Sequence, residues 1–210
     1  MPIVHRKSND FYAFAVWEST EDMYFLATLA RLTESEMVLF DTFKSTTRKR
    51  EFLTVRAVLR ELLPDNADSI TYDGNGKPHL NGQGSISISH TGNVVALMVS
   101  KTKHCGIDLE TISERILKLG KKFTNEIESM SLPTKNLIEH LQVIWGAKEV
   151  MFKIHSLGEL DFKNHMHTDS FRYYSSGSFK SFLTKTGFEK SFEIEYERFG
   201  HFMITWSYCD

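Results

Sequence analysis

Two acidic residues in the middle of the chain, Asp108 and Glu110, are spaced for metal chemistry. They follow an apolar run, residues 94–99, and a short polar break, which predicts a strand that is reached through a turn. Side chains alternate along a strand, so both carboxylates are expected on one face, about 7 Å apart. That spacing suits a shared divalent cation such as Mg²⁺. A solvated strand face is the alternative, and two carboxylates by themselves favour it.

A second segment supplies further candidate residues. A helix predicted to follow Pro133-Thr134 and to end near Lys153 carries Trp145, Glu149 and Lys153 at intervals of four, so the three side chains share one face. An aromatic ring, a carboxylate and an ammonium group in a row are also typical of an ordinary amphipathic helix with an ion pair. The segment alone leaves both interpretations open.

The two segments in this order, G-I-D-L-E at 106–110 and W-x-x-K-E-x-x-x-K at 145–153, resemble the signature pair of the 4′-phosphopantetheinyl transferase superfamily. Further matches lie upstream: Arg48-Lys49-Arg50 entering a helix, Gly76-Lys77-Pro78, and Ser89-His90-Thr91-Gly92. The resemblance covers residues 46–155, about half of the chain. Because a long segment precedes the G-I-D motif, the chain resembles the long, surfactin-synthetase-activating type rather than the short holo-synthase type.

The resemblance implies an enzyme that moves 4′-phosphopantetheine from coenzyme A to a serine of an apo acyl or peptidyl carrier protein. It implies Mg²⁺ held by Asp108, Glu110 and Glu149, with coenzyme A as the donor substrate. The implied catalytic residues are Glu149, as base, metal ligand or both, Lys153, as the cation at phosphate oxygens, and Asp108. The residues implied to bind coenzyme A are Arg48, Arg50, Lys77, Pro78, Ser89 and His90.

The basic run also has a physical argument of its own. A helix N-terminus favours anions, so Arg48 and Arg50 are poorly placed for the helix that they enter. Holding a phosphate is a natural use of such arginines. A solvated charged face is the alternative.

The order of elements predicts an α+β fold of two similar halves, residues 1–103 and 104–210, each an antiparallel sheet with one long helix. The first long helix is expected at 46–63, and residues 85–110 are expected to form an antiparallel meander. Thr33 and Glu36 have the form of a capping box, and strands are expected at 11–17, 192–196 and 202–206. The resemblance implies the same pseudodimer, with the active site between the halves, coenzyme A-binding segments in the first half and metal-binding and catalytic motifs in the second.

The composition and charge of the chain limit the classes of partner that the sequence favours. The chain has 210 residues and a formal net charge of −2, so bulk charge gives no argument for nucleic acid or membrane binding. No apolar run approaches the roughly 20 residues of a membrane span. Two cysteines, Cys105 and Cys209, have no metal-binding spacing. We expect a cytoplasmic monomer whose partners are coenzyme A and a carrier protein.

Two alternatives to this transferase are open. A non-catalytic coenzyme A- or carrier-protein-binding module would keep the fold and the basic run, but the three acidic residues and Lys153 argue against it. A different Mg²⁺-dependent phosphoryl or nucleotidyl transferase would need its own glycine-rich nucleotide loop, and neither a P-loop nor a G-x-G-x-x-G pattern is present.

The motifs depart from the family in two places. Gly146 stands where the family has a small hydroxyl residue or alanine, and glycine within a helix costs about 1 kcal/mol relative to alanine, which predicts a locally weak helix. The spacing from Glu110 to Trp145 is short for the long type. The segment between them often contributes to carrier docking in the family, so its short length bears on the carrier preference rather than on the chemistry.

Overall fold

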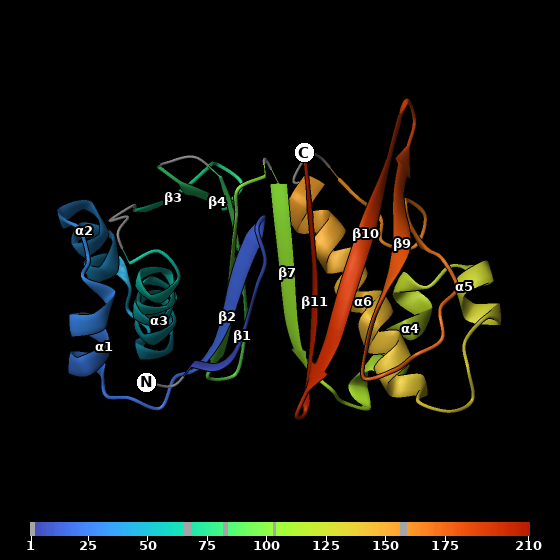
Figure 1. Cartoon of the computed structure of the whole chain (residues 1–210), viewed down its shortest axis with the longest axis horizontal. Helices are drawn as coiled ribbons and strands as arrows, with labels where there is room; N and C mark the ends of the chain where they lie inside the picture. Colours follow the sequence, from blue (N-terminus) through green and yellow to red (C-terminus); the bar gives the residue numbers. More distant parts are fainter. Residues whose placement is uncertain (1–2, 65–68, 82–83, 103, 156–158) are drawn as a thin grey trace. The chain divides into compact units, whose positions relative to one another are not determined.

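The computed structural model describes residues 3–64, 69–81, 84–102, 104–155 and 159–210. The chain divides into two compact units, Met1–His104 and Cys105–Asp210. Each unit combines helices with a mainly antiparallel sheet, so the predicted α+β class is confirmed (Figure 1). The pseudodimer, the placement of the active site between halves, and the assignment of coenzyme A binding and catalysis to separate halves stay predictions. Lys103, at which the predicted division falls, lies outside the described residues.

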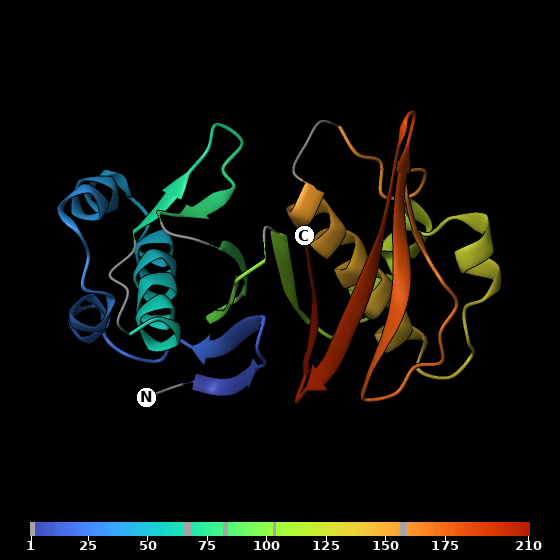
Figure 2. The same cartoon turned by 45° about the horizontal axis from the view of Figure 1, so that its top comes forward.

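The first unit contains a four-stranded sheet of order β1-β2-β6-β5 in which neighbouring strands are antiparallel. These strands are β1 (Ile3–Ser8), β2 (Tyr12–Glu18), β5 (Ser85–Thr91) and β6 (Val94–Ser100). The helices are α1 (Met23–Ala30), α2 (Glu34–Thr42) and α3 (Thr46–Leu62), and a small two-stranded sheet pairs β3 (Ile70–Tyr72) with β4 (Pro78–Leu80). Figures 1 and 2 show α3 between the four-stranded sheet and the other two helices.

Helix α3 is the centre of the first unit. Its N-cap Ser45 accepts a hydrogen bond from the Arg48 backbone N–H, and the helix ends just before Pro64, which cannot continue it. The predicted apolar stripe is buried. Val55, Leu59 and Leu62 belong to the core that α3 shares with β2 and β6, whereas Phe52 packs against the rings of Phe40 and Phe43. The capping box of Thr33 and Glu36 on α2 is also confirmed.

The second unit contains a five-stranded sheet of order β7-β11-β10-β9-β8. Its strands are β7 (His104–Thr111), β8 (Met166–Thr168), β9 (Ser176–Lys185), β10 (Phe188–Phe199) and β11 (Phe202–Cys209). Its helices are α4 (Arg115–Phe123), α5 (Glu126–Met130) and α6 (Leu137–His155). Helix α6 packs on the sheet, mainly on β11, and α4 packs on α6. None of the helices in the described residues is both long and apolar enough to cross a membrane.

The predicted meander over residues 85–110 is right for β5 and β6 and wrong for β7. Strands β5 and β6 pair with each other, whereas β7 lies beside β11 in the second sheet. The physical reason is that an apolar pattern specifies a strand but not its partner. The partner here lies about ninety residues further along the chain, so no local signal could point to it.

Candidate active site

Two glycines let β7, α6 and β11 pack closely. A Cβ atom added at Gly106 on β7 would lie 2.8 Å from the Val150 backbone oxygen on α6. A Cβ atom added at Gly146 on α6 would lie 3.0 Å from Thr205 Cβ on β11 and closer still to Thr205 Oγ1. Any side chain at either position would therefore push the helix away from the sheet. Helix α6 runs unbroken through Gly146, so this glycine serves close packing where the sequence predicted local weakness.

This packing brings Asp108 of β7 beside Lys153 of α6. Lys153 Nζ donates to Asp108 Oδ1 at 2.8 Å and to the Ile107 backbone oxygen at 2.8 Å. The Asp108 residue is only 4% exposed, and Lys153 is partly buried. A largely buried carboxylate is costly unless it is paired, and the ammonium group supplies that pairing.

Glu110, two residues further along β7, is held by a different group. Its Oε1 accepts a hydrogen bond from Trp145 Nε1 on α6 at 3.4 Å. Burial raises the pKa of Glu110, and the Asp108 carboxylate adds to that rise, while Trp145, Lys153 and Arg115 oppose it. Trp145 belongs to the W-x-x-K-E-x-x-x-K motif, but the sequence alone assigns it no role.

Glu149 completes the acidic cluster, which we define as Asp108, Glu110 and Glu149. Burial raises the pKa of Glu149 to about 7, the Asp108 and Glu110 carboxylates add to the rise, and Lys153 opposes it. Carboxylates that disfavour one another's ionisation lie within electrostatic range of one another. A carboxyl group with a pKa near 7 can accept a proton at neutral pH.

The chemistry of the acidic cluster fits a divalent cation. When all three carboxylates are ionised, they carry more negative charge than Lys153 offsets, and a bound cation would balance the excess. Within the described residues, no group of three or more His, Cys, Asp or Glu side chains is arranged as a ready-made metal cage. Mg²⁺ needs no such cage, because it takes one or two carboxylates together with waters and substrate phosphate oxygens. The assignment of Asp108, Glu110 and Glu149 as metal ligands stays a prediction.

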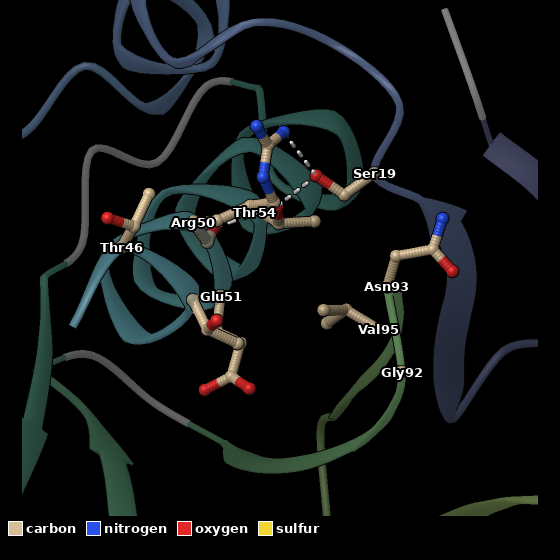
Figure 3. Close-up of a pocket in the computed structure, with 9 residues that line it drawn as sticks. Ser19, Thr46, Arg50, Glu51, Thr54, Gly92, Asn93 and Val95 are labelled. Atoms are coloured by element: carbon tan, nitrogen blue, oxygen red, sulfur yellow. Dashed lines mark hydrogen bonds between the residues drawn. The ribbon is translucent and has the colours of Figure 1, made fainter.

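In the first unit, Arg50 lines a cavity of about 250 Å³ at the N-terminal end of α3 (Figure 3). Its Nη1 donates to Ser19 Oγ at 3.5 Å and to the Glu21 backbone oxygen. Gly92, from the predicted Ser89-to-Gly92 segment, lines the same cavity. The remaining lining residues are Ser19, Thr46, Thr47, Glu51, Thr54, Asn93 and Val95.

Arg48 lines a second cavity of the first unit, about 580 Å³ in volume, together with Phe43, Tyr72 and Gly76. Gly76 belongs to the predicted Gly-Lys-Pro segment, in which the Lys77 backbone N–H donates to Asp73 Oδ1 and Pro78 begins β4. The basic run of α3 therefore borders two cavities, Arg50 the first and Arg48 the second.

Glu51 is a charged neighbour of this site that the sequence analysis missed. Its carboxylate lies 3.3 Å from Arg48 Nη1 and 3.7 Å from His90 Nδ1, so it contacts two of the residues predicted to bind coenzyme A. Ser89, the residue before His90, is buried in β5. The helical spacing of Arg48 and Glu51 predicts their pairing, but nothing local predicts the approach of His90.

The second unit is thus an α+β unit that gathers three carboxylates and a lysine where a strand meets a helix. The chain is similar to a protein of Synechocystis sp. (strain ATCC 27184 / PCC 6803 / Kazusa) named "Putative 4'-phosphopantetheinyl transferase slr0495", with 30% identity over 139 residues. The match covers 59% of this chain and 56% of the relative, so the chain spans little more than half of the relative's length. No family model matches the chain. The similarity confirms the predicted resemblance to the 4′-phosphopantetheinyl transferase superfamily, while the long, surfactin-synthetase-activating type stays a prediction.

Proposed function

We propose that this protein transfers the 4′-phosphopantetheine group of coenzyme A to a serine of an apo acyl or peptidyl carrier protein, with Mg²⁺ as the metal. The observation that carries the proposal is the acidic cluster beside Lys153, formed by the two motifs that resemble the superfamily. The similarity to the Synechocystis protein supports the same activity.

The reaction forms a bond between the serine oxygen and the β-phosphorus of coenzyme A. It breaks the bond from that phosphorus to the bridging oxygen, which leaves with adenosine 3′,5′-bisphosphate. The serine must lose its proton during the attack, and Glu149, with a pKa of about 7, is the group we assign as its acceptor. Phosphoryl transfer depends mainly on positioning and on neutralising phosphate charge.

Lys153 is placed for that neutralisation. Its ammonium group is held by Asp108 and by the Ile107 carbonyl beside the acidic cluster, so its positive charge lies where we expect the phosphate oxygens to bind. A cation held in place before the reaction needs no reorganisation when charge develops. Mg²⁺, held by carboxylates of the acidic cluster, would neutralise further charge on the pyrophosphate oxygens.

Coenzyme A binding is assigned to the first unit. The cavity at the N-terminal end of α3 is lined by Thr46 and Thr47 of the first helical turn and by Arg50, and a helix N-terminus beside a guanidinium group suits a phosphate. The second cavity offers Arg48 beside the rings of Phe43 and Tyr72, a surface suited to a nucleotide. Lys77, Pro78, Ser89 and His90 keep the coenzyme A roles that the resemblance implies.

The carrier protein is assigned to the exposed surface of α4 and α5, directly after the β7 motif. Ile127 and Met130 of α5 are 80% and 86% exposed, and Leu117 of α4 is also exposed. The exposed basic residues of α4 beside them are Arg115, Lys118, Lys121 and Lys122. We call this combined apolar and basic surface the docking surface. Carriers of this kind are expected to be acidic helical bundles, which such a surface complements.

The test is to incubate the full chain with Mg²⁺, coenzyme A and several apo carriers, and to measure intact carrier mass. We expect a gain of one phosphopantetheine, and none on a carrier whose serine is replaced by alanine. Glu149→Gln should abolish most of the transfer and leave coenzyme A binding largely intact, because the loss falls on the transition state. Tight coenzyme A binding without transfer to any carrier would favour the non-catalytic binding module.

A further inference from the structure

Two residues of the second motif, Trp145 and Lys148, have no part in the chemistry proposed above, yet one buried network joins them. Lys148 is fully buried, and its Nζ donates three hydrogen bonds: to Glu128 Oε2 at 2.7 Å, to the Phe123 backbone oxygen at 2.7 Å and to the Phe162 backbone oxygen at 2.9 Å. An ammonium group has three donors, so this one is completely satisfied inside the protein.

Glu128 is satisfied to the same degree. Its Oε2 also accepts from the Asn125 backbone N–H at 2.9 Å, and its Oε1 accepts from the backbone N–H and the hydroxyl of Thr168, both at 2.9 Å. The pair therefore ties α6 to the end of α4, to α5, to the segment at Phe162 and to β8. A buried ion pair often stabilises no more than well-packed apolar side chains would, but it fixes the geometry of the groups around it.

The groups fixed by Lys148 are those that enclose Trp145. The Phe123 and Phe162 rings flank the Trp145 ring, with ring centres 5.2 Å and 5.4 Å away. Lys148 binds the backbone carbonyls of these same two phenylalanines. The indole N–H of Trp145 in turn holds the Glu110 carboxylate of the acidic cluster.

We propose that the Lys148–Glu128 pair positions Trp145 and, through its indole N–H, the Glu110 carboxylate. Lys148 and Glu128 are positioning residues, since neither touches a reacting group. The consequence for catalysis rests on the proposed function, whereas the positioning of the indole does not. Residues that orient metal ligands typically change metal affinity by roughly 10- to 100-fold when they are replaced. If the Lys148–Glu128 pair contributed only to stability, its replacement would leave the positions of Trp145 and Glu110 in the folded protein unchanged.

The first test follows the indole N–H groups by nuclear magnetic resonance of protein labelled with ¹⁵N-tryptophan. The three tryptophans are internal controls for one another, because Trp17, Trp145 and Trp206 each donate to a glutamate. In Lys148→Met and in the milder Glu128→Gln, we expect the Trp145 signal to shift and to lose protection from hydrogen exchange. The Trp17 and Trp206 signals should stay in place. Trp145→Phe assigns the signal.

A matched control is the buried ion pair of the first unit, Arg56 Nε to Glu36 Oε1 at 3.0 Å, whose side chains are 1% and 3% exposed. Arg56→Met should lower stability and leave the Trp145 signal unchanged. An unshifted Trp145 signal in both Lys148→Met and Glu128→Gln would overturn the positioning role.

The second test measures Mn²⁺ binding to the full chain by calorimetry, in a double-mutant cycle. Lys148→Met should weaken Mn²⁺ binding by about tenfold, and it should weaken it no further in a Trp145→Phe background, because both changes release Glu110. Strictly additive effects would overturn the path through Trp145. If the wild type transfers no phosphopantetheine, the proposed function fails. The indole and Mn²⁺ measurements still decide whether the Lys148–Glu128 pair positions Trp145 and Glu110.

Discussion

We expect Gly146→Ala to destabilise the protein, although replacing a glycine within a helix by alanine usually stabilises it. In an ordinary helix the change stabilises by about 1 kcal/mol. Here the added methyl group would lie 3.0 Å from Thr205 Cβ, inside the ordinary contact distance, and would collide with Thr205 Oγ1. Overpacking costs about 1–3 kcal/mol, and a contact this close belongs to the upper half of that range, so after the helix gain we expect a net loss of about 1–2 kcal/mol. The displaced helix would also carry Glu149 away from Asp108, so transfer activity should fall with stability.

The assay is urea denaturation, in which the free energy of unfolding is compared between variants whose dependence on urea concentration has the same slope. Gly120→Ala on α4 is the matched control, because the added methyl group would meet only the Leu141 side-chain tip at 3.5 Å, an ordinary contact. It should be neutral or stabilising by up to about 1 kcal/mol. Thr205→Ala should reduce the cost of Gly146→Ala in a double-mutant cycle. A Gly146→Ala protein as stable as Gly120→Ala would refute the close packing of α6 on β11.

Three further outcomes are expected. Without metal, Glu149→Gln should stabilise the protein by about 2–3 kcal/mol at pH 8, because burial raises the pKa of Glu149 from 4.5 to about 7. A raised carboxyl pKa means that the wild type loses stability as the pH rises from 4.5 to 7. The difference in free energy of unfolding between Glu149→Gln and the wild type, measured by urea titration, should therefore vanish below pH 4.5. A difference that does not change with pH would contradict the burial of Glu149. Arg50→Ala should weaken coenzyme A binding by about 1–2 kcal/mol in calorimetry, and the loss should shrink at high salt; unchanged affinity would leave the first cavity without a role in binding coenzyme A. Ile127→Asp should raise the KM for the carrier several-fold, through lost apolar contact and like-charge repulsion, with the KM for coenzyme A unchanged; an unchanged carrier KM would move the docking surface elsewhere.

The local elements could largely be predicted from the sequence. Helix α3 has an apolar stripe and a proline just past its end, and β10 alternates so that Phe192, Ile194 and Tyr196 are buried. Helix α1 was missed because its sequence is apolar on every side, leaving Tyr24 exposed, so no periodicity marked it. Its N-cap, Asp22, was the signal available.

The candidate site was predictable as a set of residue types but not as a set of contacts. The motif spacing placed Asp108 and Glu110 on a strand, and Glu149 and Lys153 on one helix. The contact of Gly146 with Thr205 joins residues about sixty positions apart. Pairings of this kind follow from packing of the whole unit, which no local pattern encodes.

The position of β7 beside β11 also sets the order in which the second unit can form during synthesis. Strand β7, which carries Asp108 and Glu110, lies at one edge of its sheet, and its neighbour there is β11, the last strand of that sheet to be translated. Helix α6 and the β9–β10 hairpin emerge from the ribosome earlier and can pack with mostly local contacts. The strand with the acidic residues cannot pair with β11 until β11 has been translated, so its edge is exposed to wrong pairing until then. The nascent second unit is therefore expected to gain protease resistance late, when β11 leaves the ribosome.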